Sequence, residues 1–388
     1  MVKILIKQVF IILASILFLL NSCNQGNKGK GYYLIDVRSS IENKGSQVFI
    51  SALKKDLKYI KLQTPDHILR FIQKVEITDN FIFVSDRKGL YQFDHNGQFH
   101  REVGRIGKGP GEHNGNIRFT VNFSQNEILI YSYLQNINVY DLESGLFKRA
   151  LNVNTDLYDL IVLENGEIVF FTWDLPGSDL YAELNEVFLI NQLGIRKDSI
   201  INISRQGVRG NVMGRPSIYV HEGQIHYIYN FRDTLYRIDK SFNRIVYAAF
   251  KTDNQDSRNN FMLTPGPEIV HYPDYISLPH VLENNEFIFL TLQKGIRPSI
   301  AQNTTTALYN KKDQQILITP EGFNNDLDGG LNFWPQWLSQ GKLVAYHHAY
   351  EIIEYFEQNK ENNKWEPDFF ELVKSLNEFD NPVLVILD

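Results

Sequence analysis

The stretch IFVSDRKGLYQFDHNGQFHREVGRIGKGPGEH, from Ile82 to His113, decides the fold. It contains short runs of β-branched and aromatic residues separated by polar turns, a pattern typical of strands rather than helices. His95-Asn96-Gly97 is a turn of the Asn-Gly type and predicts a tight antiparallel hairpin. The stretch and the residues just before it therefore predict a four-stranded antiparallel sheet with strands at Lys74–Ile77, Phe81–Ser85, Leu90–Phe93 and Gln98–Val103.

The central part of this pattern, a turn residue followed by an apolar strand, recurs along the whole chain. Each copy opens with Asn or Gly, residues that adopt positive φ at low steric cost. The early copies have the spacing of about 40–50 residues that four-stranded repeats show, and the later copies are further apart. The sequence thus predicts an all-β fold, a six-bladed β-propeller of four-stranded antiparallel blades, whose copies begin at Asn80, Asn126, Gly166, Gly223, Asn285 and Gly341.

Closing such a ring requires the two ends of the chain to meet in one blade. Lys58–Leu62 and Val383–Leu387 are both strand-like, and we expect them to complete the sixth blade together. A short helical insertion is expected before the last strand, because Pro367 suits a first helical turn and an apolar stripe follows it. We expect this helix to cover the last blade. The stripe consists of Phe369, Phe370, Val373 and Leu376.

The signature GRIGKGPGE, Gly104 to Glu112, gives the chain a resemblance to a known family. The stretch Ile82–His113 closely resembles the first blade of the six-bladed β-propeller lipoproteins of Bacteroidota, which are relatives of NHL-repeat propellers. The closing NPVLVIL, Asn381 to Leu387, fits the same family. The resemblance implies the propeller fold over the mature chain. It implies no activity and no catalytic residues.

The N-terminus predicts export and a lipid anchor. Lys3 and Lys7 precede an apolar run, Val9–Leu20, that is too short to span a bilayer. Leu20-Asn21-Ser22-Cys23 then approximates a bacterial lipobox, and Cys23 is the single cysteine of the chain. We therefore predict a signal peptide over residues 1–23 with lipidation at Cys23, a flexible tether over 24–31 and the propeller over 32–388. The residues after Cys23 are not acidic, which favours a periplasm-facing anchor in the cell envelope.

Charge and composition exclude some partners. The formal net charge is −6, and no basic run interrupts it, so the electrostatic footprint of a nucleic-acid-binding protein is missing. Membrane contact is expected through the N-terminal lipid alone. Aromatic residues make up 13% of the chain, enough for a substantial core.

Long segments between the predicted strands all fall on one face of the propeller, whereas the turns on the opposite face are short. Insertions gathered on one face of a repeat fold are typical of its binding face. Drift in unconstrained loops is the alternative. The long segments are Gly104–Gly115, Trp173–Glu186, Ser204–Arg215, Asp253–Leu278 and Gln293–Thr304.

The glycine-rich segment starting at Gly104 invites comparison with a phosphate-binding loop. A P-loop requires Lys followed by Ser or Thr at the start of a helix, whereas Lys108 is followed by Gly109 and Pro110. A crossover between blades that needs glycines for its backbone path is the simpler interpretation. Arg105 and Lys108 are still candidates for contact with an anionic ligand.

Other candidate ligand-binding residues lie where predicted strands end. They are Arg87, Arg232, Trp173, which offers a stacking surface for a sugar or peptide, and His347. Adjacent strand residues point to opposite faces, so His347 and His348 cannot chelate one ion together, and no ligand spacing supports a metal site. We predict no cofactor and no catalytic residue.

These observations favour a non-enzymatic binding or scaffold protein whose loop-rich face engages a glycan, a peptide or an envelope protein. The alternative is a hydrolase or lyase with its site at the mouth of the central channel. A cluster of acids and histidines with perturbed pKa values at that mouth would favour the enzyme. The ligand, the membrane leaflet and the oligomeric state cannot be derived from the sequence.

Overall fold

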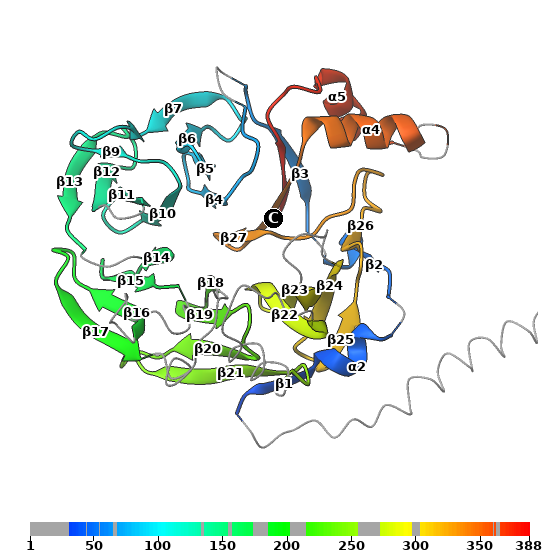
Figure 1. Cartoon of the computed structure of the whole chain (residues 1–388). Helices are drawn as coiled ribbons and strands as arrows, with labels where there is room; N and C mark the ends of the chain where they lie inside the picture. The colour runs from blue at the N-terminus through cyan, green and yellow to red at the C-terminus, as the bar shows by residue number, and fades with distance from the viewer. Residues whose placement is uncertain are drawn as a thin grey trace, which may run out of the picture.

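The chain forms a ring of blades with their innermost strands around a common axis (Figure 1). The computed structural model describes residues 31–43, 45–53, 55–64, 68–132, 136–153, 157–173, 185–201, 215–254, 272–296, 303–359, 361 and 365–388. The predicted signal peptide with Cys23, and residues 24–30 of the predicted tether, lie outside these residues. None of the described helices is long and apolar enough to cross a membrane.

The first blade confirms the expected strands within a residue at each end. Its strand order is β4-β5-β6-β7, all antiparallel. The Asp94 carboxylate accepts backbone N–H bonds from Asn96 and Gln98 at 2.8 and 2.9 Å, and Gly97 takes φ +80°. These features make the hairpin turn. The strands are β4 (Lys74–Ile77), β5 (Ile82–Ser85), β6 (Leu90–Phe93) and β7 (Phe99–Val103).

The next four blades follow the same order, from the axis outward. Blade 2 consists of β10 (Ile117–Asn122), β11 (Glu127–Ser132), β12 (Ile137–Asp141) and β13 (Phe147–Leu151). Blade 3 consists of β14 (Asp159–Val162), β15 (Ile168–Phe171), β16 (Asn185–Ile190) and β17 (Arg196–Ile201). Blade 4 consists of β18 (Pro216–His221), β19 (Gln224–Tyr229), β20 (Thr234–Ile238) and β21 (Arg244–Lys251). Blade 5 consists of β22 (Tyr272–Glu283), β23 (Phe287–Ile296), β24 (Asn303–Asn310) and β25 (Gln315–Ile318).

The sixth blade closes the ring as expected. Its order is β27-β28-β29-β3, so the last strand, β29 (Val383–Leu387), pairs with the early strand β3 (Leu57–Lys61). The inner strands are β27 (Trp337–Ser339) and β28 (Lys342–His347). The buried Asn381 side chain fastens this closure, because it accepts the Leu69 N–H at 2.7 Å and donates to the Gln63 carbonyl at 2.9 Å.

The N-terminal segment runs along the outside of the ring, which the sequence analysis did not predict. Strand β1 (Tyr33–Asp36) adds to the outer edge of blade 4 by parallel pairing with β21. Helix α2 (Val37–Ile41) follows, and β2 (Val48–Phe49) pairs with β26 (Phe323–Asn324) beyond blade 5. A short 3-10 helix, Ile50–Leu53, leads on to β3. The chain thus joins three blades before the first complete blade begins (Figure 1).

Two helices interrupt blade 6 between β28 and β29. Helix α5 (Pro367–Ser375) confirms the expected helix, with Pro367 in its first turn and Phe369 and Val373 buried. Helix α4 (Ala349–Asn359) was not predicted. Both pack against Tyr59 of β3 and against Leu331, at the outer edge of the ring (Figure 1).

Apolar side chains pack mainly between neighbouring blades. One cluster fills the contact of blades 6 and 1, and others fill the contacts of blades 1 and 2, 2 and 3, and 3 and 4. The largest cluster joins blades 4, 5 and 6 with β1 and α2. Full burial of each large apolar side chain contributes roughly 1.5–3 kcal/mol to the free energy of unfolding. Because these side chains are buried between blades, a single blade could not gain this energy alone.

A cluster of buried ion pairs and hydrogen bonds also links blades 3 and 4. Glu186 of β16 is fully buried and accepts from Arg232 at 2.8 Å, Arg244 at 2.5 Å and the Tyr227 hydroxyl at 2.6 Å. All three donors belong to blade 4 or its loop. A buried carboxylate requires such partners, since an unpaired charge in the interior is costly.

Replacing Glu186 should therefore be costly. Glu186→Ala leaves the buried guanidinium of Arg232 and the partly buried one of Arg244 without their carboxylate, and we expect the free energy of unfolding to fall by about 3–5 kcal/mol in denaturant titrations. Glu167→Ala is the matched control, because Glu167 pairs with the half-exposed Lys197 and surface pairs contribute at most about 1 kcal/mol. Equal losses in both variants would contradict the assignment of Glu186 as an inter-blade tie.

Candidate functional site

The glycine-rich segment after β7 binds its own carboxylate. The Gly109 N–H donates to Glu112 Oε2 at 2.7 Å, and Arg105 Nε donates to Glu112 Oε1 at 2.7 Å. The hydrogen bond from Gly109, with the bond from Arg105, holds the pKa of the Glu112 carboxyl below its usual value. The backbone donor that a phosphate would need is thus already used, and this segment is no phosphate cradle.

Side chains of blade 2 also hydrogen-bond to the backbone of this segment, which forms the crossover from blade 1. The Tyr140 hydroxyl donates to the Gly111 carbonyl at 2.7 Å, and Asn138 Nδ2 donates to the Glu112 carbonyl at 3.0 Å. Gly111 takes φ +72°, and a Cβ there would lie 2.6 Å from the Phe147 ring. Gly111 is therefore required by the conformation and close packing of the backbone. This agrees with the interpretation of the segment as a crossover between blades.

The structure separates the predicted ligand-binding residues. Arg105 and Lys108 are exposed on the crossover, and Arg105 is engaged by Glu112. Arg232 is buried between blades 3 and 4 in its ion pair with Glu186, so its guanidinium has a structural partner. His347 is half-buried at the end of β28, its Nε2 has no hydrogen-bond partner, and burial lowers its pKa.

Trp173 lies at one end of the ring axis, beside side chains that the sequence analysis did not single out. In blades 1 to 5 the first residue of the innermost strand lies opposite the last residue of the second strand, as in Asp159↔Phe171 and Pro216↔Tyr229. We call this end of the ring the loop face. Trp173 follows β15 on this face, and Tyr158 precedes β14 beside it, with ring centroids 4.7 Å apart.

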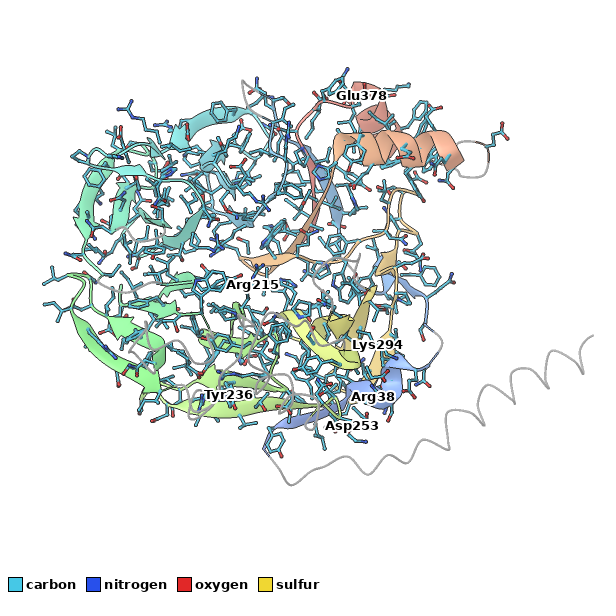
Figure 2. All side chains as sticks on the ribbon, in the orientation of Figure 1. Arg38, Arg215, Tyr236, Asp253, Lys294 and Glu378 are labelled. Carbon is cyan, nitrogen blue, oxygen red and sulfur yellow. The ribbon has the colours of Figure 1, made fainter. Side chains whose placement is uncertain are left out.

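Two arginines from the neighbouring blades complete this group. The Arg118 guanidinium of blade 2 lies 5.2 Å from the centre of the Tyr158 ring, and that of Arg215 lies 5.8 Å from the centre of the Trp173 ring. We call Arg118, Tyr158, Trp173 and Arg215 the rim cluster. Figure 2 shows Arg215 close to the centre of the ring of blades.

Local structure explains these positions. In β10, Ile117 and Phe119 are buried and pack between blades 1 and 2, so the alternation of the strand turns Arg118 toward blade 3. Arg215 is fixed through its backbone, since its N–H donates to Asn230 Oδ1 at 2.9 Å and its carbonyl accepts from the Asn230 N–H at 3.0 Å. The Tyr158 N–H donates to the Phe171 carbonyl at 2.6 Å.

The loop face continues from the rim cluster toward blades 1 and 6. Gln73 Nε2 donates to Asn116 Oδ1 at 3.5 Å, and Trp337 Nε1 donates to the Gln73 carbonyl at 3.3 Å. The predicted residue Arg87 lies on the same face, exposed, with its guanidinium 5.2 Å from the ring centre of the exposed Phe71. Aromatic and cationic side chains thus follow the inner edge of five blades.

Two titratable groups with shifted pKa values lie on inner strands away from the rim cluster. Burial raises the pKa of Glu76, which accepts from the Ser339 hydroxyl at 3.0 Å. Burial lowers the pKa of His280 to about 4, and a hydrogen bond to the backbone of Gln336 opposes this. Each group has its own partner next to β27. Among the described residues, no three His, Cys, Asp or Glu side chains are grouped so that they could hold a metal ion.

Most of the long segments that predicted a loop-rich face fall outside the described residues. These parts are 174–184, 202–214, 255–271 and 297–302. Sequence reasoning found Trp173 but missed Arg118, Tyr158 and Arg215. The detectable signal was a polar or aromatic residue within one position of the first residue of an inner strand, in three successive repeats.

Comparisons with known proteins agree with this fold. A family model described as a domain of unknown function (DUF4934) matches residues 32–388. A solved structure from Bacteroides fragilis, of a protein assigned as exported, is 18% identical with a TM-score of 0.67 and covers 92% of this chain and 99% of its own. A member of the DUF4221 family from Bacteroides vulgatus is 11% identical with a TM-score of 0.47, covering 86% and 97%. No curated protein matches the sequence.

The close contact between the crossover and Phe147 of blade 2 predicts that two glycine substitutions lower stability to different extents. Gly111→Ala combines left-handed backbone strain with a clash against Phe147, whereas Gly223→Ala, at φ +69°, meets no atom within 4 Å. Left-handed strain costs roughly 1–2 kcal/mol, so we expect Gly223→Ala to lose about this much stability and Gly111→Ala clearly more. Urea denaturation measures both losses. Equal losses would show that the crossover does not press on Phe147.

Proposed function

The chain belongs to the DUF4934 family, and we propose that it is an exported, lipid-anchored propeller that acts as a non-enzymatic binding or scaffold protein. Its binding site is the loop face around the ring axis, and its ligand is a glycan, a peptide or an envelope partner. The single observation that carries this proposal is the rim cluster, in which three blades bring two arginines and two aromatic rings together.

The arrangement suits binding for a physical reason. Aromatic faces provide contact area at low entropic cost, and guanidinium groups provide directional donors. Each side chain of the rim cluster stands on or beside a strand whose backbone is fixed by its blade, so the site is preorganised. A rigid site needs no ordering on binding, and therefore keeps more of its interaction energy as affinity.

Catalysis is less well supported by the same residues. The acid Glu76 and the base His280 have separate structural partners, and neither belongs to the rim cluster. The hydrolase or lyase alternative would need these groups, or groups outside the described residues, to converge on one substrate.

Export and anchoring rest on two supports. The similar structure from Bacteroides fragilis is of a protein assigned as exported. The sequence supplies a signal-peptide pattern that ends at Cys23. Lipidation there would tether the propeller to the cell envelope through residues 24–31, with the anchor facing the periplasm. The first described strand, β1, lies on the outer edge of blade 4, so this tether would leave the ring at its periphery, away from the rim cluster.

Lipidation has a direct test. Cells that express the full chain should incorporate labelled fatty acid into it, and Cys23→Ala should abolish the label, because no other cysteine can accept the lipid. Cys23→Ser is a useful second variant with nearly unchanged size. Label that persists in either variant would rule out this anchor.

Binding can be tested by thermal stabilisation of the full chain in detergent against saccharides, peptidoglycan fragments, peptides and metals. A ligand specific for the folded state adds about 2.7 kcal/mol at a hundred times its dissociation constant. We expect a hit from the saccharides or peptides that Trp173→Ala abolishes.

Trp365→Ala serves as the control, since Trp365 packs against Phe356 and Phe369 beside the helices and should not affect binding. Complete absence of a ligand and of a captured partner, together with turnover of any substrate, would refute the binding role.

A further inference from the structure

Within the part of the chain that the structure describes, several arginines of the ring form an ion pair with a carboxylate, whereas the two arginines of the rim cluster do not. Arg232 and Arg244 pair with Glu186, Arg149 pairs with Glu127, and Arg105 pairs with Glu112. No carboxylate of the described residues lies within ion-pair distance of Arg118 or Arg215. The chain carries more acidic than basic residues, 45 against 39. That Arg118 and Arg215 nevertheless have no carboxylate partner among the described residues calls for an explanation.

Both positive charges act on the same point. Burial raises the pKa of the Tyr158 hydroxyl, and the charges of Arg118 and Arg215 both oppose that rise, with Arg118 adding a side-chain hydrogen bond. The two guanidinium groups lie against two rings that contact each other, Tyr158 and Trp173, although they come from blades 2 and 4. Their joint potential at this point favours a negative charge.

Among the described residues, the nearby charges do not cancel this potential. Asp159 follows Tyr158 and is the acid that acts on it, and one of its oxygens accepts the Leu160 N–H at 2.8 Å. One acid against two arginines leaves a net positive charge. Further along the axis Lys74 acts on Glu76, and these two charges balance one another.

The guanidinium groups keep donors for a ligand. A guanidinium has five N–H donors. Arg118 uses one on the Ile117 carbonyl at 2.9 Å and one on Tyr158. The Arg215 side chain is exposed, and its described contact is with the face of the Trp173 ring. Planar forks of this kind bind carboxylate, sulfate and phosphate groups with two parallel hydrogen bonds.

We propose that Arg118 and Arg215 together bind one oxyanion group, a carboxylate, sulfate or phosphate, of a small ligand whose remaining surface lies against Tyr158 and Trp173. This site rests on the proposed binding function and names the chemistry of its ligand. The position at the ring axis, between strands of three blades, suits a compact group or the end of a chain.

The test is calorimetric titration of the full chain in detergent at low ionic strength with glucuronate, inorganic sulfate and inorganic phosphate. These three probes separate the possible sources of the oxyanion. We expect at least one to bind, with affinity that falls as salt is added. Arg118→Gln and Arg215→Gln should each weaken it roughly ten- to a hundredfold, the usual effect of losing a charge-assisted hydrogen bond.

Arg196→Gln is the matched control. Arg196 also lies over an aromatic ring, 4.1 Å from the centre of Phe188, but stands on the outer strand β17. It removes the same charge and the same kind of ring contact, so affinity should stay unchanged. Thermal unfolding of each variant shows whether the ring remains intact.

The outcomes separate the two proposals. An anion that binds all variants equally overturns the assignment to Arg118 and Arg215. Failure of all three anions, while a neutral ligand binds and Trp173→Ala abolishes its binding, overturns the oxyanion site and leaves the binding function standing. Failure of every ligand, neutral or charged, and of partner capture, together with turnover of a substrate, refutes both.

Discussion

Pairing of β3 with β29 is the constraint on which the rest of the structure depends. These strands come from opposite ends of the sequence, and their register from Lys61↔Val383 to Leu57↔Leu387 completes blade 6. Asn381 fastens the closure from a fully buried position. Closure leaves no blade with an open side, and it fixes the spacing of all six inner strands around the axis. The rim cluster is a product of that spacing, because no blade contains more than two of its members.

The blades were predictable because their signals are local. Alternation of apolar residues gives the strands, and Asn-Gly turns such as Asn96-Gly97 give the hairpins, so strand limits in blade 1 agree within a residue. The outer strand β1 and helix α4 were missed for a physical reason. The short run Tyr33–Asp36 becomes a strand because the edge of β21 is there to pair with it. Helix α4 begins directly after His348, without the proline that marked α5.

The candidate site was predictable to a lesser extent. Residue type singled out Trp173 as a stacking surface, and the structure places it beside other aromatic and cationic groups, but the same reasoning placed Arg232 with the ligand-binding residues. Its partner Glu186 stands on another blade, far away in the sequence, and only the packed ring brings the two together. Arg118 looked like an ordinary strand residue, since alternation shows which face of a strand it occupies and not what lies opposite. Contacts between blades join residues that are far apart in the sequence, so a local sequence pattern does not predict them.

The most direct test of the central claim, that three blades of a closed ring form one binding site, is amide hydrogen exchange of the full chain with and without glucuronate, sulfate or phosphate. The account predicts that protection rises together at the starts of β10, β14 and β18, which carry or follow the members of the rim cluster. Protection confined to one blade, or to the crossover at Gly104–Glu112, would contradict it.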